Sequence, residues 1–253
     1  MFGKSIGSLF WFESPIQTEA TSRLLYVTEQ GESFVLLLGD RGTGKSSVLR
    51  SVRSECRRFG HSCLLISAAA LDENALLWHL CGGLSITPHR GSSRSRLMAV
   101  IRDEIAGRAM CSHQTVIILD DLDLAAEDLS SVLQFLAAAN EQTNGGVSVV
   151  AGASGALSSE LKQLSALRVE LRPFTEQESQ EFSLQLLTSL QADTSRIEPD
   201  AMAAIVQFGK GLPARLTRLC EVLSLALISD PTLRINAETF HALTGETLLS
   251  RAG

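Results

Sequence analysis

Residues 39–46 combine glycines, a lysine and a serine at a spacing that suits phosphate binding. Their sequence, GDRGTGKS, fits the pattern GxxxxGKS or GxxxxGKT at every fixed position. Glycines let a backbone curve until several N–H groups point at one anion, and the lysine adds a positive charge. The set that we expect to hold the phosphates of a nucleotide is Gly39, Asp40, Arg41, Gly42, Thr43, Gly44, Lys45, Ser46 and Ser47.

The segments on either side of this loop fit the same chemistry. The apolar run 34–38 predicts a buried parallel strand, and 45–58 predicts a helix whose N-terminus faces the anion. We expect Lys45 to reach the β- and γ-phosphates and Ser46 to ligate Mg²⁺. The alternative is a glycine-rich turn that only joins a strand to a helix, and the complete pattern argues against it.

Two aspartates follow the most strand-like segment of the chain, at residues 115–119. Ligand sites in parallel sheets lie at the carboxyl ends of the strands. We therefore expect Asp120 to hold Mg²⁺ together with Ser46, and Asp121 to orient or activate a water molecule. By themselves these acids could equally cap the next helix, and Asp123 is interpreted as a helix-start or surface residue.

Strands and helices alternate up to residue 172, and the pattern is only helical after it. Further strands are predicted at 62–67, 146–152 and 167–171, and helices at 72–80, 94–108 and 126–139. From 173 onward a capping box, Thr175 with Glu178, opens helical patterns at 175–190, 199–208, 212–228 and 236–244. We predict an α/β P-loop domain at 1–172, with a five-stranded parallel sheet flanked by helices, and an all-helical lid domain at 173–253.

Composition and net charge argue against several classes of protein. The 253 residues carry a net charge of −6, which argues against broad binding to nucleic acid by charge alone. Five scattered cysteines form no CxxC pair, and no apolar run reaches the roughly 20 residues of a membrane span. We expect a cytoplasmic protein with free thiols. Arginines on the helix at 45–58 and in the 90–96 segment keep a nucleic-acid or acidic partner open, but a solvated surface is favoured.

In this order, these residues resemble the AAA+ superfamily, and within it the ATPase domain of the general secretion pathway protein A family. More distantly they resemble the transposition and the origin-recognition and Cdc6-like ATPases. Besides the P-loop, the resemblance rests on an opening aromatic–proline segment at 12–15, the junction at 168–174 and a sensor-2-like segment that begins at Gly211-Leu212-Pro213. It implies ATP bound between the sheet domain and the helical lid, and an oligomer in which a neighbouring copy supplies an arginine.

The chain departs from that family at four places. Asp121 stands where the family has glutamate, Ser154 where it has a longer polar sensor, and Ala214 where an arginine follows the proline. The turn before the last strand offers only Lys162 and Arg168 as cations. Arg215 is the candidate contact to the γ-phosphate within the same chain. These changes leave nucleotide binding intact and bear on hydrolysis, which needs charge placed at the γ-phosphate.

Three functions follow from these residues. The first is an oligomeric ATPase that assembles or remodels a partner complex, such as a secretion or assembly system, with a DNA-associated transposition or replication ATPase as a less favoured form. The second is an ATP-binding switch or scaffold with little hydrolysis. The third, a small-molecule kinase, leaves the helical tail without a role, and a GTPase lacks an Asn-Lys-x-Asp motif.

Overall fold

The computed structural model describes residues 12, 14–155 and 157–249, so that Glu13 of the expected opening segment at 12–15 lies outside the described residues. The elements run in the order α1 (Pro15–Glu29), β1 (Phe34–Leu38), α2 (Lys45–Arg58), β2 (Ser62–Ser67), α3 (Glu73–Gly83), α4 (Arg94–Met110), β3 (Thr115–Asp120), η2 (Leu122–Leu124), α5 (Ser130–Gln142), β4 (Val147–Ala153), α6 (Ser159–Leu164), β5 (Leu167–Glu170), α7 (Glu176–Ser189), η3 (Thr194–Arg196), α8 (Pro199–Gly209), α9 (Pro213–Ser229) and α10 (Ala237–Leu249).

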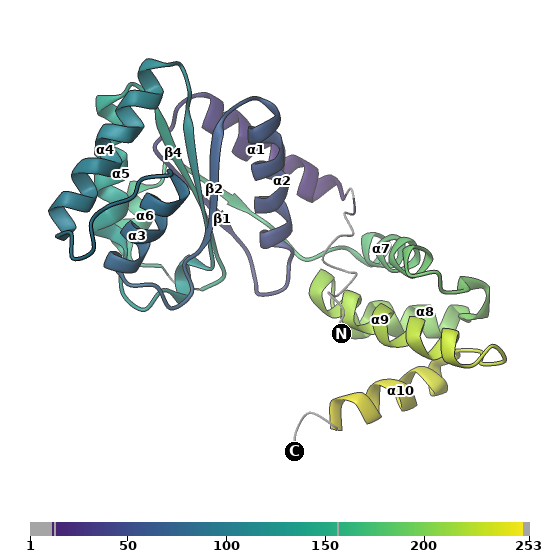
Figure 1. Cartoon of the computed structure of the whole chain (residues 1–253). Helices are drawn as coiled ribbons and strands as arrows, with labels where there is room; N and C mark the ends of the chain where they lie inside the picture. Colours follow the sequence, from purple (N-terminus) through teal and green to yellow (C-terminus); the bar gives the residue numbers. More distant parts are fainter. Residues whose placement is uncertain (1–11, 13, 156, 250–253) are drawn as a thin grey trace. The chain divides into compact units, whose positions relative to one another are not determined.

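The five strands form one parallel sheet in the order β2-β3-β4-β1-β5, which confirms the predicted α/β fold (Figure 1). Helices α1 and α2 cover one face of the sheet, and α3, α4, α5 and α6 cover the other (Figure 1). Strand order differs from chain order, because β4 lies between β1 and β3. Because the strands are parallel, the carboxyl ends of β1, β4 and β3 lie next to one another. This is where we expected the phosphate loop and the acidic residues.

Side chains alternate between two apolar cores along each central strand. Val35 and Leu37 of β1 pack with α1 and α2, whereas Phe34 and Leu36 pack with the helices on the opposite face. This is the alternation expected of a strand covered on both faces, and it explains why the strands read as continuous apolar runs. Fully burying one such side chain stabilises the fold by about 1.5–3 kcal/mol.

A network of amide and carbonyl groups ties the amino ends of the strands together. The Asn140 side-chain amide donates to the carbonyl oxygens of Gly31, at 2.8 Å, and Val147, at 2.5 Å. Gly31 and Gly145 both have left-handed backbones, with φ of 74° and 89°, and a Cβ on Gly31 would lie 3.0 Å from the Gly145 Cα. The turns before β1 and β4 can therefore approach this closely only as glycines.

Contacts divide the described residues into two compact units. The sheet unit comprises 15–40, 45–155 and 157–171, and the helical unit comprises 172–249 together with Phe12, Ser14 and Arg41–Gly44. Within the helical unit, Phe12 is buried and its ring makes edge-on contacts with the rings of Phe174 and Phe182, with centroids 5.6 and 5.4 Å away. We keep the division at residues 172 and 173 as the proposed domain boundary.

Several elements differ from those expected. Helices α1 and α6 were not predicted, although α1 covers the P-loop strand. The helix expected from residue 126 begins only at Ser130, because the Asp128 carboxylate accepts the Ser130 N–H at 2.8 Å and turns the chain before the helix. The predicted capping box is present at the start of α7.

That capping box carries a charge as well as hydrogen bonds. Burial raises the pKa of Glu178, but hydrogen bonds from the Thr175 amide and hydroxyl and from Arg172 outweigh it, so the pKa lies below its ordinary value. The lowered pKa means that the fold stabilises the ionised form of Glu178 relative to its protonated form.

We predict that Glu178→Gln lowers the free energy of unfolding at neutral pH by about 1 kcal/mol, because glutamine keeps the cap but loses the charge. The stabilisation by Glu178 is present above its ordinary pKa of 4.5 and is lost as pH falls through the lowered pKa. Urea unfolding of both proteins at a series of pH values should show the difference closing in acid. Glu176→Gln, in the same turn but exposed, is the control; a difference that does not change with pH would contradict the prediction.

Candidate functional site

The loop between β1 and α2 is shaped by two glycines with left-handed backbones. Gly42 and Gly44 have φ of 91° and 99°, where a side chain would be strained. Asp40 and Arg41 are exposed, whereas Thr43 is only 1% exposed. The loop ends at Lys45, the first residue of α2, so that free N–H groups of the helix N-terminus follow directly.

Lys45 is buried, with 6% of its surface exposed, and its ammonium group is held by three oxygen atoms. It donates to the carbonyl oxygens of Gly39, at 2.9 Å, and Asp40, at 3.1 Å, and to the Ser154 Oγ at 2.5 Å. Ser154 follows the end of β4, the strand that neighbours β1. The ammonium therefore joins the carboxyl ends of two adjacent strands.

The electrostatic surroundings of Lys45 have two opposing parts. Burial lowers the pKa of Lys45, and the carboxylates of Asp123, Asp120, Asp121 and Asp40 offset only part of this effect, so the pKa lies below its ordinary value. A buried ammonium is costly unless it is hydrogen-bonded and faces opposite charge. This site provides both, and it keeps a positive charge within reach of an anion at the loop.

Ser46 and Ser47 lie in the first turn of α2 and are partly buried. Asp120 is the last residue of β3, and its carboxylate accepts the N–H of Asp121 at 3.0 Å. Gly152 of β4 leaves room for that carboxylate, because a Cβ there would lie 3.3 Å from the Asp120 Oδ1. A hydroxyl and a carboxylate are hard oxygen donors of the kind that Mg²⁺ takes.

Asp121 turns the chain immediately after β3. Its backbone is left-handed, with φ of 56° and ψ of 42°, and it precedes the short helix η2. Aspartate tolerates this conformation better than most residues. The structure thus places Asp121 beside Asp120 at the strand end, and the side chain is partly buried.

Asp123 belongs to this site, although we interpreted it from the sequence as a helix-start or surface residue. Its carboxylate accepts the N–H of Ser154 at 2.9 Å, and among the carboxylates it has the largest effect on the pKa of Lys45. It therefore connects η2 to the end of β4. The only sequence signal was the spacing of three aspartates at 120, 121 and 123, which does not indicate which of them points back to the sheet.

The remaining candidate cations lie in other surroundings. Arg168 donates to the Lys162 carbonyl oxygen at 2.6 Å and to the Ser165 Oγ at 3.4 Å, so it is bound within its own turn. Arg215 is exposed on α9 of the helical unit. No helix within the described residues has the length and apolar character needed to cross a membrane.

The sheet order, the glycine loop before α2 and the carboxylates after β3 together define a P-loop fold of the AAA+ type. The model of the family described as AAA ATPase domain matches residues 17–150, which is more than half of the chain. The chain belongs to the AAA ATPase domain family.

Individual relatives agree with this assignment. General secretion pathway protein A of Aeromonas hydrophila is 25% identical over 120 residues, which are 47% of this chain and 22% of that protein. The matched region therefore spans about a fifth of the relative's length. The match confirms the predicted resemblance to the general secretion pathway protein A family.

Solved structures share the fold at low sequence identity. Cdc6p of Pyrobaculum aerophilum has a TM-score of 0.77 at 16% identity, covering 94% of this chain and 69% of that chain. The Drosophila ORC bound to DNA has a TM-score of 0.68 at 16% identity, covering 92% and 60%. The Thermotoga maritima RuvB Holliday junction branch migration motor has a TM-score of 0.59 at 18% identity, covering 96% and 72%.

The contact between Lys45 and Ser154 can be tested without any ligand. We predict that Ser154→Ala lowers the free energy of unfolding by about 1.5–3 kcal/mol, because a buried charged donor loses an acceptor. In a Lys45→Met background the same change should cost much less, giving a coupling energy above about 0.5 kcal/mol in a double-mutant cycle. Urea unfolding of the four proteins measures this coupling, and purely additive effects would contradict it.

Proposed function

We propose that this chain binds MgATP at residues 39–47 and hydrolyses it to assemble or remodel a partner complex. The observation that carries the proposal is the buried ammonium of Lys45 at the start of α2, held beside a loop with two left-handed glycines. Such a loop and helix N-terminus suit a polyphosphate, because backbone N–H groups and a fixed positive charge converge on it.

Each residue of the loop has a proposed part in phosphate binding. Lys45 contacts the β- and γ-phosphates, and on binding it exchanges its protein oxygen acceptors for phosphate oxygens. The other contacts come from backbone N–H groups of the curved loop and the first turn of α2. The residues assigned to these contacts are Gly39, Asp40, Arg41, Gly42, Thr43, Gly44, Ser46 and Ser47.

Ser46 and Asp120 are the proposed Mg²⁺ ligands. Within the described residues, no group of three or more histidine, cysteine or acidic side chains could hold a metal ion. Two protein oxygens suit Mg²⁺, because this ion is commonly bound by one or two carboxylates together with phosphate oxygens and water. When bound, the ion supplies positive charge that neutralises the phosphates.

Asp121 and Arg215 are proposed to act at the γ-phosphate. Asp121 orients or activates the attacking water, which it can do only when a carboxylate oxygen comes within hydrogen-bond reach of that water. Arg215 is proposed as the contact to the γ-phosphate within the same chain. We also propose that a neighbouring copy in an oligomer supplies the further cation that efficient hydrolysis needs.

A second candidate function is an ATP-binding switch with little hydrolysis. Two observations support it: the Arg168 side chain is hydrogen-bonded within its own turn, and the side chain of Asp121 is short. Both leave few groups of this chain to act on the γ-phosphate. In such a protein, ATP would shift the balance between two conformations and a partner would bind one of them.

The partner complex is proposed from the relatives. General secretion pathway protein A is a secretion protein by its name, which favours a protein partner in a secretion or assembly system. Structures similar in fold include one bound to DNA and a Holliday junction motor, so a DNA-associated role is the alternative. The net charge of −6 favours the protein partner.

We predict that the chain binds ATP in the presence of Mg²⁺ and that Lys45→Ala weakens binding at least tenfold, because the phosphates lose a fixed charge. Isothermal titration calorimetry measures binding, and phosphate release at several protein concentrations measures turnover. Arg50→Ala, an exposed change on the same helix, is the control. Turnover per chain that rises with concentration supports the oligomeric ATPase, and binding with negligible turnover at every concentration supports the switch. Binding that is indifferent to Lys45 would overturn both.

We also predict that Asp121→Asn keeps ATP affinity within about threefold while turnover falls by roughly 10²–10⁴, the usual contribution of a general base. Asp103→Asn, an exposed change on α4, should leave both unchanged. If Asp121→Asn leaves turnover unchanged, the carboxylate does not act on the water.

A further inference from the structure

Strand β2 lies at the end of the sheet, and no strand within the described part of the chain pairs with its outer edge. On the side of β3, the Ser62 N–H donates to the backbone carbonyl oxygen of Gln114, and the Ala68 N–H donates to the backbone carbonyl oxygen of Asp120. Because successive residues of a strand point their N–H and C=O groups to opposite edges, those of Cys63, Leu65 and Ser67 point outward. An open edge of this kind is a template for another strand.

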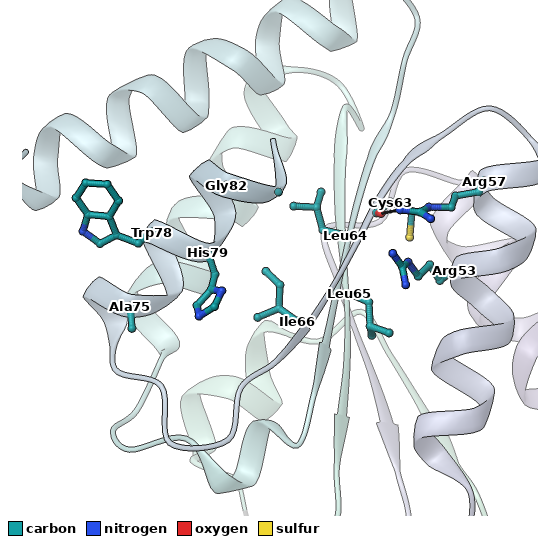
Figure 2. Close-up of a pocket in the computed structure, with 11 residues that line it drawn as sticks. Arg53, Arg57, Cys63, Leu64, Leu65, Ile66, Ala75, Trp78, His79 and Gly82 are labelled. Carbon is teal, nitrogen blue, oxygen red and sulfur yellow. Dashed lines mark hydrogen bonds between the residues drawn. The ribbon is translucent and has the colours of Figure 1, made fainter. Parts of the chain in front are cut away.

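A hollow of about 650 Å³ runs along this open edge, between α2 and α3 (Figure 2). It lies in the sheet unit, and no residue of the phosphate loop lines it. Its two walls differ in chemistry, as Figure 2 shows: two arginines come from α2 on one side, and Ala75, His79 and Gly82 come from α3 on the other.

Arg53 and Arg57 form the α2 wall, one helical turn apart. Arg57 donates to the outward carbonyl oxygen of Cys63 at 3.4 Å, which leaves most of its donors available. Among the residues that the structure describes, the buried Nε of Arg53 has no hydrogen-bond partner. A buried donor without a partner is costly, so that turning the Arg53 guanidinium toward an acceptor in the hollow would be favourable.

The α3 wall is mostly apolar and has open space. Ala75 and His79 of α3 line the hollow together with Leu64 and Ile66 of β2, and the Trp78 ring lies on the side of α3 turned away from β2 (Figure 2). Gly82 adds room, because a Cβ there would meet no atom within 4 Å. This wall suits apolar side chains of an occupant.

We propose that this hollow is a docking site for an extended acidic peptide of a partner protein, which adds to β2 as a sixth strand. Its backbone would pair with the outward groups of Cys63, Leu65 and Ser67. Since side chains of a strand alternate between faces, acidic residues would point to Arg53 and Arg57, and apolar residues to the α3 wall and the space at Gly82. The occupant is acidic because the charged wall is positive, in contrast to the net charge of −6 of the whole chain.

The test uses a labelled ten-residue peptide that alternates valine and glutamate, titrated against the full chain by fluorescence anisotropy. Two N-methylated versions carry the methyl groups on the valines or on the glutamates, so that one version blocks each edge of the peptide. We expect the parent peptide to bind and one methylated version to lose at least tenfold in affinity while the other does not. The same peptide with lysine in place of glutamate should not bind.

Variants of the protein locate the site. The double change Arg53→Gln with Arg57→Gln should weaken peptide binding at least tenfold, whereas Arg50→Gln, on the same helix outside the hollow, should not. Gly82→Trp should fill the hollow and abolish binding. Gly107→Trp on α4 is the matched control, because a Cβ at either glycine meets no atom within 4 Å. Thermal unfolding checks that all variants are folded.

Four results with the peptides would overturn the proposal. These are no binding of the acidic peptide at millimolar concentration, equal binding of the lysine peptide, equal loss in both methylated versions, and binding that is unchanged in the arginine and Gly82 variants. A single-stranded oligonucleotide that binds more tightly than the peptide through the same arginines would also overturn it, in favour of a nucleic-acid site. Peptide binding at this hollow does not require ATP, so the peptide experiments remain a valid test even if the chain does not bind nucleotide.

Discussion

The buried ammonium of Lys45 needs oxygen partners and negative charge around it, because an isolated charge in a protein interior is strongly unfavourable. The ends of β1 and β4 provide the acceptors, and the residues after β3 provide carboxylates. A sheet order with β4 between β1 and β3 is what brings these three strand ends together. The apolar strands and their two cores can therefore be understood as the frame that positions one charged group.

Much of this frame could be predicted from the sequence, because the central strands are continuous apolar runs and the phosphate loop is a fixed pattern. Helix α1 could not be predicted in the same way, since its buried face includes Gln17, Thr21 and Thr28 and its hydrophobic periodicity is weak. The site residues Lys45 and Asp120 follow from local pattern. Asp123 does not, because its contact with Ser154 depends on how η2 meets the end of β4 in space.

Tertiary arrangement also decides which surfaces are open. The run at 62–67 was predicted as a strand, but nothing in its own residues indicates that it would lie at the edge of the sheet. Strand order brings Arg53 and Arg57 to that edge, although the sequence showed them only as part of a basic helix face. The basic face of α2 and the unpaired strand β2 can therefore be recognised as neighbours only from the fold.

The two ends of the sheet differ in how they are held. At the amino ends, Asn140 and the touching glycines Gly31 and Gly145 join neighbouring turns through neutral groups and direct backbone contact. At the carboxyl ends, a single ammonium and several carboxylates face one another. Neutral, closely packed contacts respond little to an arriving charge, whereas a charge cluster must rearrange when a polyanion enters. We therefore expect a bound polyanion to change the contacts at the carboxyl ends of the strands more than those at their amino ends.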